Sequence, residues 1–263
     1  MGEATIAPQE NASTPPHEEP TPILIDTMAE AAKACAFLRT HKVLAMDMEG
    51  APLETRTCLL QLAASPREVY IFDLMVLSHH ELFNAAHLLP ILTDPGILKL
   101  CYDVRGDGAA LYLQHGLQVH GLYDLQIVFT SLHQSPDDPF LKGLHRAVER
   151  LKSVSAGAAC AFAKRKASFR STLSPATTFV KRPLDHSLLA YAAWDVAYLM
   201  DMFRLWSPYV AEHAVLAATA ERLARHIRRR RRCCSTLNMT MSRVDFVPVR
   251  AKRLCFVVPS RRL

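Results

Sequence analysis

The spacing of apolar residues changes part-way along the chain, and the change separates a strand-rich part from a helix-rich part. Residues Thr27–Arg39 have the spacing of a helix that begins with an N-capping threonine. Three short β-type runs follow, at Val43–Glu49, Cys58–Ala64 and Val69–Leu74. The segments between these runs are too short to hold crossover helices. The three strands are therefore expected to form an antiparallel meander.

Two further strands are predicted later in the chain, at Ile97–Tyr102 and Val119–Tyr123, among segments of helical spacing. The expected helices are His79–Leu92, Val104–His115, Leu125–His133, Phe140–Lys152, His186–Leu205 and Ala211–Ile227. A meander followed by α-β-α-β predicts an α/β fold, in which a mixed sheet is flanked by helices. This order excludes a purely parallel doubly wound sheet, and the chain has no glycine-rich loop of the nucleotide-cradling type.

Charge is distributed unevenly, and it suggests how the chain is organised. Residues 1–22 contain four acids and no base, and we expect them to form a disordered, proline-rich leader. The folded domain is expected over residues 23–227, with a basic insertion at about 153–182, and a basic tail over 228–263. Residues 142–182 contain ten bases and a single acid, Glu149. Two basic zones on an otherwise balanced domain favour a polyanionic partner.

Other compositional features narrow the class of protein. No apolar run approaches the roughly 20 residues that span a bilayer, so no membrane partner is expected. The leader lacks the basic start and apolar run of a secretory signal. The seven cysteines contain no CxxC pair, which indicates neither a disulfide framework nor a zinc site. We therefore predict an intracellular protein, cytoplasmic or nuclear, with the arginine run Arg228–Arg232 as a weak nuclear import signal.

Acidic residues occur in patterns that suggest metal chemistry. Asp47 and Glu49 are two apart in a strand, so they point to the same face, while Leu44, Met46 and Met48 fill the other face. Two carboxylates side by side in an apolar strand repel each other and lose solvation. A divalent cation would make the same arrangement favourable.

Two more groups of residues extend the pattern. Asp103 and Asp107 lie where an apolar strand leads into a helix, and spacing alone does not choose between them. Tyr191 and Asp195 are four apart in a predicted helix and share one face. Carboxylates from a strand, a strand–helix junction and a late helix can surround two divalent ions roughly 3.5–4 Å apart, the arrangement used for phosphodiester hydrolysis. All-oxygen ligands suit Mg²⁺, with Mn²⁺ as a substitute.

The order of these motifs resembles the DEDD exonucleases, in the ribonuclease D branch with its Egalitarian-type relatives. The first motif of that family, Asp-x-Glu, is met by Asp47 and Glu49. The second matches residues 102–107, and the resemblance selects Asp107 as its catalytic aspartate. The third, Tyr-Ala-Ala-x-Asp-Val-x-Tyr-Leu, matches Tyr191–Leu199. Ala190 stands where a histidine variant would have His, so the resemblance is to the tyrosine subclass. It covers about residues 25–206.

The resemblance implies a ribonuclease H-like fold and metal-dependent hydrolysis at the 3′ end of single-stranded nucleic acid, RNA more than DNA. One ion would be held mainly by Asp47, Asp107 and Asp195, and the second by Asp47. Glu49 would bind metal or anchor the terminal nucleotide, and Tyr191 would orient the attacking water. The alternative reading is a nucleic-acid-binding scaffold of the same fold with weak or no catalysis. The resemblance would also place a helical nucleic-acid-binding domain downstream, and we do not expect one within these 263 residues.

Basic residues of the second half are candidates for holding the nucleic-acid backbone without reading its sequence. They are Lys142, Arg146, Lys164, Arg165, Lys166, Arg170, Lys181 and Arg182.

Overall fold

The computed structural model describes residues 19–50, 57–84, 87–135, 138, 140–172 and 178–235. Most of the predicted leader and most of the predicted basic tail lie outside the described residues. The side chain of Arg170 lies outside them as well.

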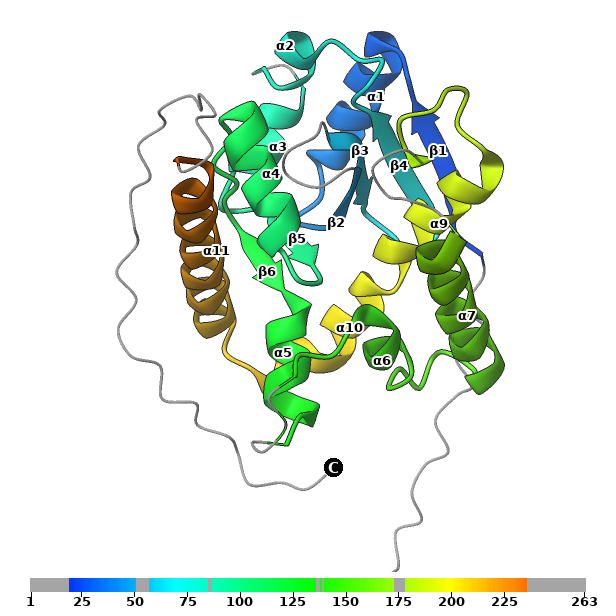
Figure 1. Cartoon of the computed structure of the whole chain (residues 1–263), viewed down its shortest axis with the longest axis vertical. Coiled ribbons are helices and arrows are strands. Elements are labelled where there is room, and N and C mark those ends of the chain that lie inside the picture. Colours follow the sequence, from blue (N-terminus) through cyan, green and yellow to red (C-terminus); the bar gives the residue numbers. More distant parts are fainter. Residues whose placement is uncertain are drawn as a thin grey trace, which may run out of the picture.

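A six-stranded mixed sheet forms the centre of the described part (Figure 1). The strands are β1 (Thr21–Ile25), β2 (Val43–Gly50), β3 (Thr57–Ala63), β4 (Glu68–Asp73), β5 (Leu98–Cys101) and β6 (Leu122–Asp124). Their order is β1-β4-β3-β2-β5-β6. Strands β2, β3 and β4 pair antiparallel, while β1 joins β4, β5 joins β2 and β6 joins β5 in parallel. The predicted meander and mixed sheet are confirmed.

Helices cover both faces of this sheet, and each face has its own apolar core. One core includes side chains of α1 (Met28–Leu38), α2 (His79–Leu82), α3 (Leu88–Thr93), α4 (Arg105–His115) and α11 (Glu212–Ser235). The other includes side chains of α5 (Leu125–His133), α6 (Leu144–Val148), α7 (Ala156–Thr172), α9 (His186–Ala197) and α10 (Leu199–Trp206), and a short turn η1 (Ser207–Tyr209) follows α10. None of the described helices is both long and apolar enough to cross a membrane.

Several predicted elements differ from the structure. Strand β1 was not predicted, and it begins inside the segment expected to be a leader. The helix predicted at His79–Leu92 is two short helices, and the one predicted at His186–Leu205 is divided into α9 and α10 at Tyr198. The helix expected at Ala211–Ile227 continues to Ser235 and so contains the whole run Arg228–Arg232.

The sequence analysis predicted residues 153–182 as a basic insertion and assigned no helix to them. Residues 156–172 of this stretch form the helix α7. Its sequence contains six alanines and no proline, and alanine has the highest helix propensity. The alanines favour a helical backbone here, and the lysines and arginines make the helix basic. Lys164, Arg165, Lys166 and Arg170 therefore lie on a helix.

An ion pair attaches the segment before α9 to the sheet. Arg182 donates two hydrogen bonds to the carboxylate of Asp73, which is 1% exposed at the end of β4. The same guanidinium donates to the carbonyls of Phe179 and Lys181. Arg182 therefore holds the polypeptide that leads into α9, and its charge is engaged by Asp73.

We predict that Arg182→Met lowers the free energy of unfolding by about 2–3 kcal/mol, because it leaves a buried carboxylate without its partner. Arg204→Met is the matched control, since Arg204 is 67% exposed and pairs with Asp201 at 3.5 Å. The control is expected to cost about 0.5 kcal/mol or less. Urea denaturation of the three proteins measures both values, and equal losses would contradict the structural role of Arg182.

Candidate active site

Two acidic residues extend from β2 toward α9. The side chains of Leu44, Met46 and Met48 are buried in the core on the opposite face of the sheet. Alternation along the strand therefore places Asp47 and Glu49 on the α9 side, as the sequence pattern predicted. A register shift between Glu49 and Gly50 ends the regular pairing of β2 with β3. The pair thus lies near the end of the strand.

The third carboxylate comes from α9, which packs across β2 and β3. One oxygen each of Asp47, Glu49 and Asp195 lies within 4.8 Å of the others. Tyr191 is one helical turn before Asp195, and both side chains are buried. The structure therefore brings together four of the five side chains predicted to form the site.

The fifth residue, Asp107, lies in the first turn of α4. Its carboxyl group donates a hydrogen bond to Asp47. Asp47 is thus shared between two groups, one with Glu49 and Asp195 and the other with Asp107. Asp103 was the alternative that spacing left open, and its carboxylate is bound instead by Arg105 at 2.6 and 2.7 Å.

The electrostatics of the cluster are unfavourable as it stands. Burial raises the pKa of Asp47 to about 7, with repulsion from Asp195 adding to the shift. Burial and the neighbouring carboxylates also raise the pKa values of Glu49 and Asp107 well above their ordinary range. A divalent cation among these oxygens would convert repulsion into attraction. The residues present therefore fit a hard divalent metal, which binds oxygen ligands.

A lysine supplies positive charge to the cluster. Lys166, on α7, forms an ion pair with Asp195 and donates a hydrogen bond of 3.1 Å to the hydroxyl of Tyr191. Its ammonium group also lies 4.6 Å from the centre of the Tyr191 ring. The carboxylates and the phenolic oxygen raise the pKa of Lys166 despite its burial. Among the predicted backbone-binding residues, this one is inside the cluster.

Gln61 is a polar residue at the site that the sequence analysis missed. It is directly opposite Asp47 in the pairing of β2 with β3 and has no exposed surface. Neither end of its amide group has a hydrogen-bond partner among the described residues. A buried amide without partners costs roughly 1–3 kcal/mol. The sequence signal was available, because Gln61 interrupts the apolar run 58–63.

The remaining predicted basic residues are arranged differently. Lys164 and Lys181 are exposed, and Arg165 stacks on Trp194 with 5.5 Å between guanidinium carbon and ring centre. Lys142 and Arg146 pair with nearby acids, Asp138 and Glu149. Arg182 is engaged by Asp73, as described above.

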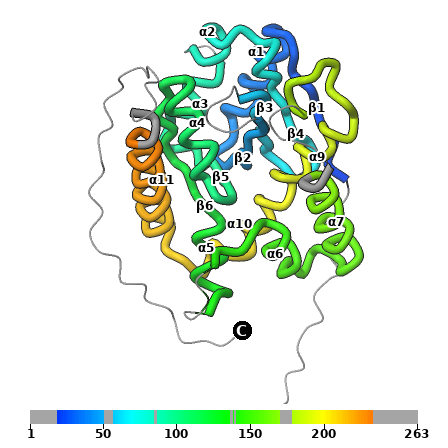
Figure 2. The backbone as a smooth tube through the Cα atoms, viewed as in Figure 1, coloured from blue at the N-terminus to red at the C-terminus, as the bar shows by residue number. Residues whose placement is uncertain are grey.

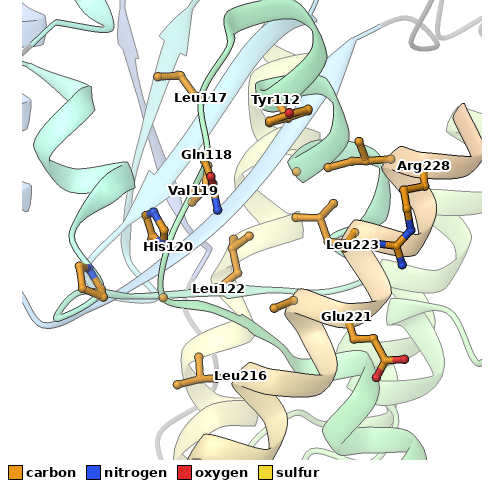
Figure 3. A pocket seen from close by; sticks show the side chains of 16 residues that line it. Tyr112, Leu117, Gln118, Val119, His120, Leu122, Leu216, Glu221, Leu223 and Arg228 are labelled. Atoms are coloured by element: carbon orange, nitrogen blue, oxygen red, sulfur yellow. The ribbon is translucent and has the colours of Figure 1, made fainter. Parts of the chain in front are cut away.

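A separate hollow lies between β6, α4 and α11 (Figure 3). It has a volume of about 290 Å³ and is lined mainly by apolar side chains, including Leu117, Leu122 and Leu223. None of the five predicted site residues lines it. The carboxylate cluster is therefore not part of this pocket.

Comparison with known proteins adds to this geometry. A family model described as 3′-5′ exonuclease matches residues 22–206, which contain all three motifs. This chain belongs to the 3′-5′ exonuclease family. The family resemblance drawn from the motifs is thereby confirmed. A curated relative, ribonuclease D of Nitrobacter hamburgensis, is 26% identical over 183 residues, 68% of this chain. The match spans 42% of that relative's length.

Solved structures of family members share the fold. Ribonuclease D of Trypanosoma brucei in complex with GMP has a TM-score of 0.67 and 23% identity, covering 78% of this chain and 64% of that one. The same enzyme in complex with RNA U12 has a TM-score of 0.66 and 24% identity, covering 78% and 70%. Ribonuclease D of Escherichia coli has a TM-score of 0.60 and 21% identity, covering 79% and 51%. The predicted ribonuclease H-like fold is confirmed.

Because the pKa of Asp47 is raised, we predict that the stability of the metal-free protein depends on pH. Between pH 4 and pH 7 the folded state holds a proton that the unfolded state has released, so stability falls as pH rises through this window. Asp47→Asn removes the buried charge. The free energy of unfolding of the variant, relative to the parent, should therefore be about 2–3 kcal/mol more favourable at pH 8 than at pH 5.

Urea denaturation in EDTA at the two pH values measures this difference. Glu68→Gln serves as the control, because Glu68 is an exposed carboxylate at the start of β4. A relative stability of Asp47→Asn that is the same at both pH values would refute the prediction.

Proposed function

We propose that this chain is a metal-dependent exonuclease that releases nucleotides from the 3′ end of single-stranded nucleic acid, RNA in preference to DNA. The observation that carries the proposal is the convergence of Asp47, Glu49 and Asp195 within 4.8 Å in a chain of the 3′-5′ exonuclease family. Asp107 and Tyr191 complete the proposed site.

The preference for RNA is supported by the relatives. The curated relative is a ribonuclease D, and the Trypanosoma brucei ribonuclease D structures include complexes with GMP and with RNA U12. Because the chain spans less than half of the curated relative's length, the activity and substrate of that whole protein are part of the proposal here.

The carboxylates would hold two divalent cations, Mg²⁺ with Mn²⁺ as a substitute. When bound, such ions supply the positive charge that an attacking and a leaving oxygen need in phosphodiester hydrolysis. Asp47 would contribute to both, because it neighbours Asp107 on one side and Glu49 with Asp195 on the other. Glu49 would bind metal or anchor the terminal nucleotide. Gln61 supports the proposal that a ligand binds beside Asp47, since its unpartnered amide faces the same side of the sheet as Asp47.

Tyr191 would orient the attacking water. Burial raises the pKa of its phenol, so the hydroxyl remains protonated at neutral pH and acts by hydrogen bonding, not as a base. Lys166 donates a hydrogen bond to the same oxygen, so the phenolic O–H can donate its proton to another acceptor, such as the attacking water.

The backbone of the incoming strand would be held by basic residues of α7 and nearby segments. Lys164 and Lys181 are exposed and suited to phosphate contacts that are independent of sequence. Lys142, Arg146, Arg165 and Arg170 belong to the same proposal.

A second candidate function is a nucleic-acid-binding scaffold with weak or no turnover. One observation favours it, namely that Lys166 already supplies a positive charge to Asp195. The digestion experiment below separates the two candidates.

Digestion of matched single-stranded RNA and DNA tests the proposed activity. With Mg²⁺, the protein should release labelled mononucleotide from 3′-labelled RNA and progressively shorten 5′-labelled RNA. Asp47→Ala and Asp195→Ala should each lower the rate at least 1,000-fold, because each removes an oxygen ligand that the two ions need. EDTA should abolish release.

Glu68→Gln, at an exposed carboxylate outside the site, should keep the full rate. Binding of RNA without release in either Mg²⁺ or Mn²⁺ would reject the exonuclease and support the scaffold. Faster release from DNA than from RNA would reject only the substrate preference.

Replacement of the phenol tests the role of Tyr191. Tyr191→Phe should lower kcat about tenfold or more with little change in KM, because the attacking water loses an orienting hydrogen bond present in the transition state. The dependence of the rate on Mg²⁺ concentration should stay unchanged, since the phenol is not a proposed ligand. A change confined to KM would argue for a substrate-binding role instead.

A further inference from the structure

Helix α11 lies outside the segment that matches the exonuclease family, yet it packs beside α4, the helix that carries Asp107. Figure 2 shows the two helices side by side, although they come from distant parts of the chain. Two guanidinium groups of α11 make polar contacts here. Arg231 donates a hydrogen bond of 2.8 Å to the hydroxyl of Tyr112 on α4, and Arg222 reaches Asp103, just before α4, across 119 residues of sequence.

Asp124 connects Arg222 to the turn that precedes α4. Its carboxylate has no exposed surface and accepts hydrogen bonds from three backbone N–H groups. Those of Asp103 (2.9 Å) and Val104 (3.4 Å) belong to the turn just before α4. That of Gln126 (3.0 Å) caps the start of α5. One buried carboxylate therefore holds the ends of two helices.

Arg222 supplies the counter-charge for this carboxylate. Its guanidinium contacts Asp124 at 2.8 Å and Asp103 at 3.2 Å, and it also donates to the side-chain oxygen of Gln126. Thr219, one turn earlier on α11, accepts a hydrogen bond of 3.2 Å from the backbone N–H of Asp124. A buried carboxylate without such a partner would favour its neutral form and accept these N–H bonds less strongly.

The turn held in this way sets the direction of α4. Asp103 has a φ of 65°, in the left-handed region that is uncommon for residues other than glycine, although aspartate adopts it more readily than most. Val104 follows as the N-cap, and Asp107 lies in the first turn, where it meets Asp47. A small rotation of this turn would move the Asp107 carboxyl group away from the cluster.

Apolar packing between α11 and α4 is close at one point and open beside it. Gly108 allows a close approach, because a Cβ there would lie 2.7 Å from a methyl carbon of Leu223. Beside this contact, however, the apolar pocket of Figure 3 leaves part of the interface between α4, β6 and α11 unfilled. The ion pair of Arg222 adds a directional contact at the start of α4, where Arg231 and Tyr112 supply one farther along the two helices.

We infer that Arg222 is a positioning residue of the active site, which acts through Asp124 and the left-handed turn at Asp103 to place Asp107 for metal binding. The inference rests on the proposed function, since it concerns the same site. It assigns a role in that site to a helix beyond the family-matched segment.

Four variants of the full chain test this inference, with Mn²⁺ alone as the titrant. Arg222→Met should weaken Mn²⁺ binding tenfold or more by isothermal titration calorimetry, as expected when the support of a ligand is lost. Arg222→Lys, which keeps the charge, should recover part of the affinity. Arg225→Met is the matched control on the same helix, because Arg225 is 72% exposed and pairs with Glu221 at 2.7 Å.

Leu223→Ala separates positioning from plain stability. It removes the packing against Gly108 without touching the carboxylates, so it should lower the Tm while leaving Mn²⁺ affinity within about twofold of the parent. In RNA digestion, Arg222→Met should lower kcat and raise the metal concentration for half-maximal rate, and Leu223→Ala should do neither.

Parent-like Mn²⁺ affinity in Arg222→Met would overturn the inference, as would affinity losses that simply follow Tm across the variants. If the parent binds Mn²⁺ but does not hydrolyse RNA or DNA, the proposed function fails while the affinities still decide the inference. A parent that binds no Mn²⁺ would overturn both.

Discussion

Repulsion among carboxylates is the constraint around which this structure is built. Asp47, Glu49, Asp107 and Asp195 are held together in partly dehydrated surroundings, where burial and then repulsion from neighbouring carboxylates raise the pKa values of Asp47, Glu49 and Asp107. An isolated strand or helix would separate such groups. The fold instead brings them together from strand β2 of the sheet and from the helices α4 and α9. The folded protein therefore holds these carboxylates close together before a cation binds, and a bound cation would relieve their repulsion.

The surrounding residues provide charge and support for this arrangement. Lys166 gives Asp195 a counter-charge, and Arg182 anchors the polypeptide that enters α9 through its pair with Asp73. Arg222 does the same for the turn that enters α4. Each helix that carries a site residue therefore has a cation near its start or its face. The basic residues of the second half serve internal ion pairs as well as the surface.

Much of the fold and the site could be predicted from sequence because the signals were local. The period of two in residues 43–49 gives both the strand and the common face of Asp47 and Glu49. The interval of four gives the shared face of Tyr191 and Asp195. The choice of Asp107 over Asp103 needed the family resemblance, since it depends on which carboxylate Arg105 and Arg222 engage. The helix α7 was missed because charge was weighed above alanine content. The roles of Gln61 and Arg222 were missed because they depend on strand register and on contacts between distant residues.

The position of α11 late in the chain has a consequence for synthesis. Segments made first can begin to fold while later ones are still being added. The strands and helices that carry the site residues all precede residue 200, whereas the contact between Arg222 and Asp103 joins residues 119 apart. Closing that contact must wait until α11 has been made, and contacts of such long range form late in folding. A nascent chain can therefore form its sheet before α11 supports the turn that leads into α4, and that support must wait until residues 212–235 have been made.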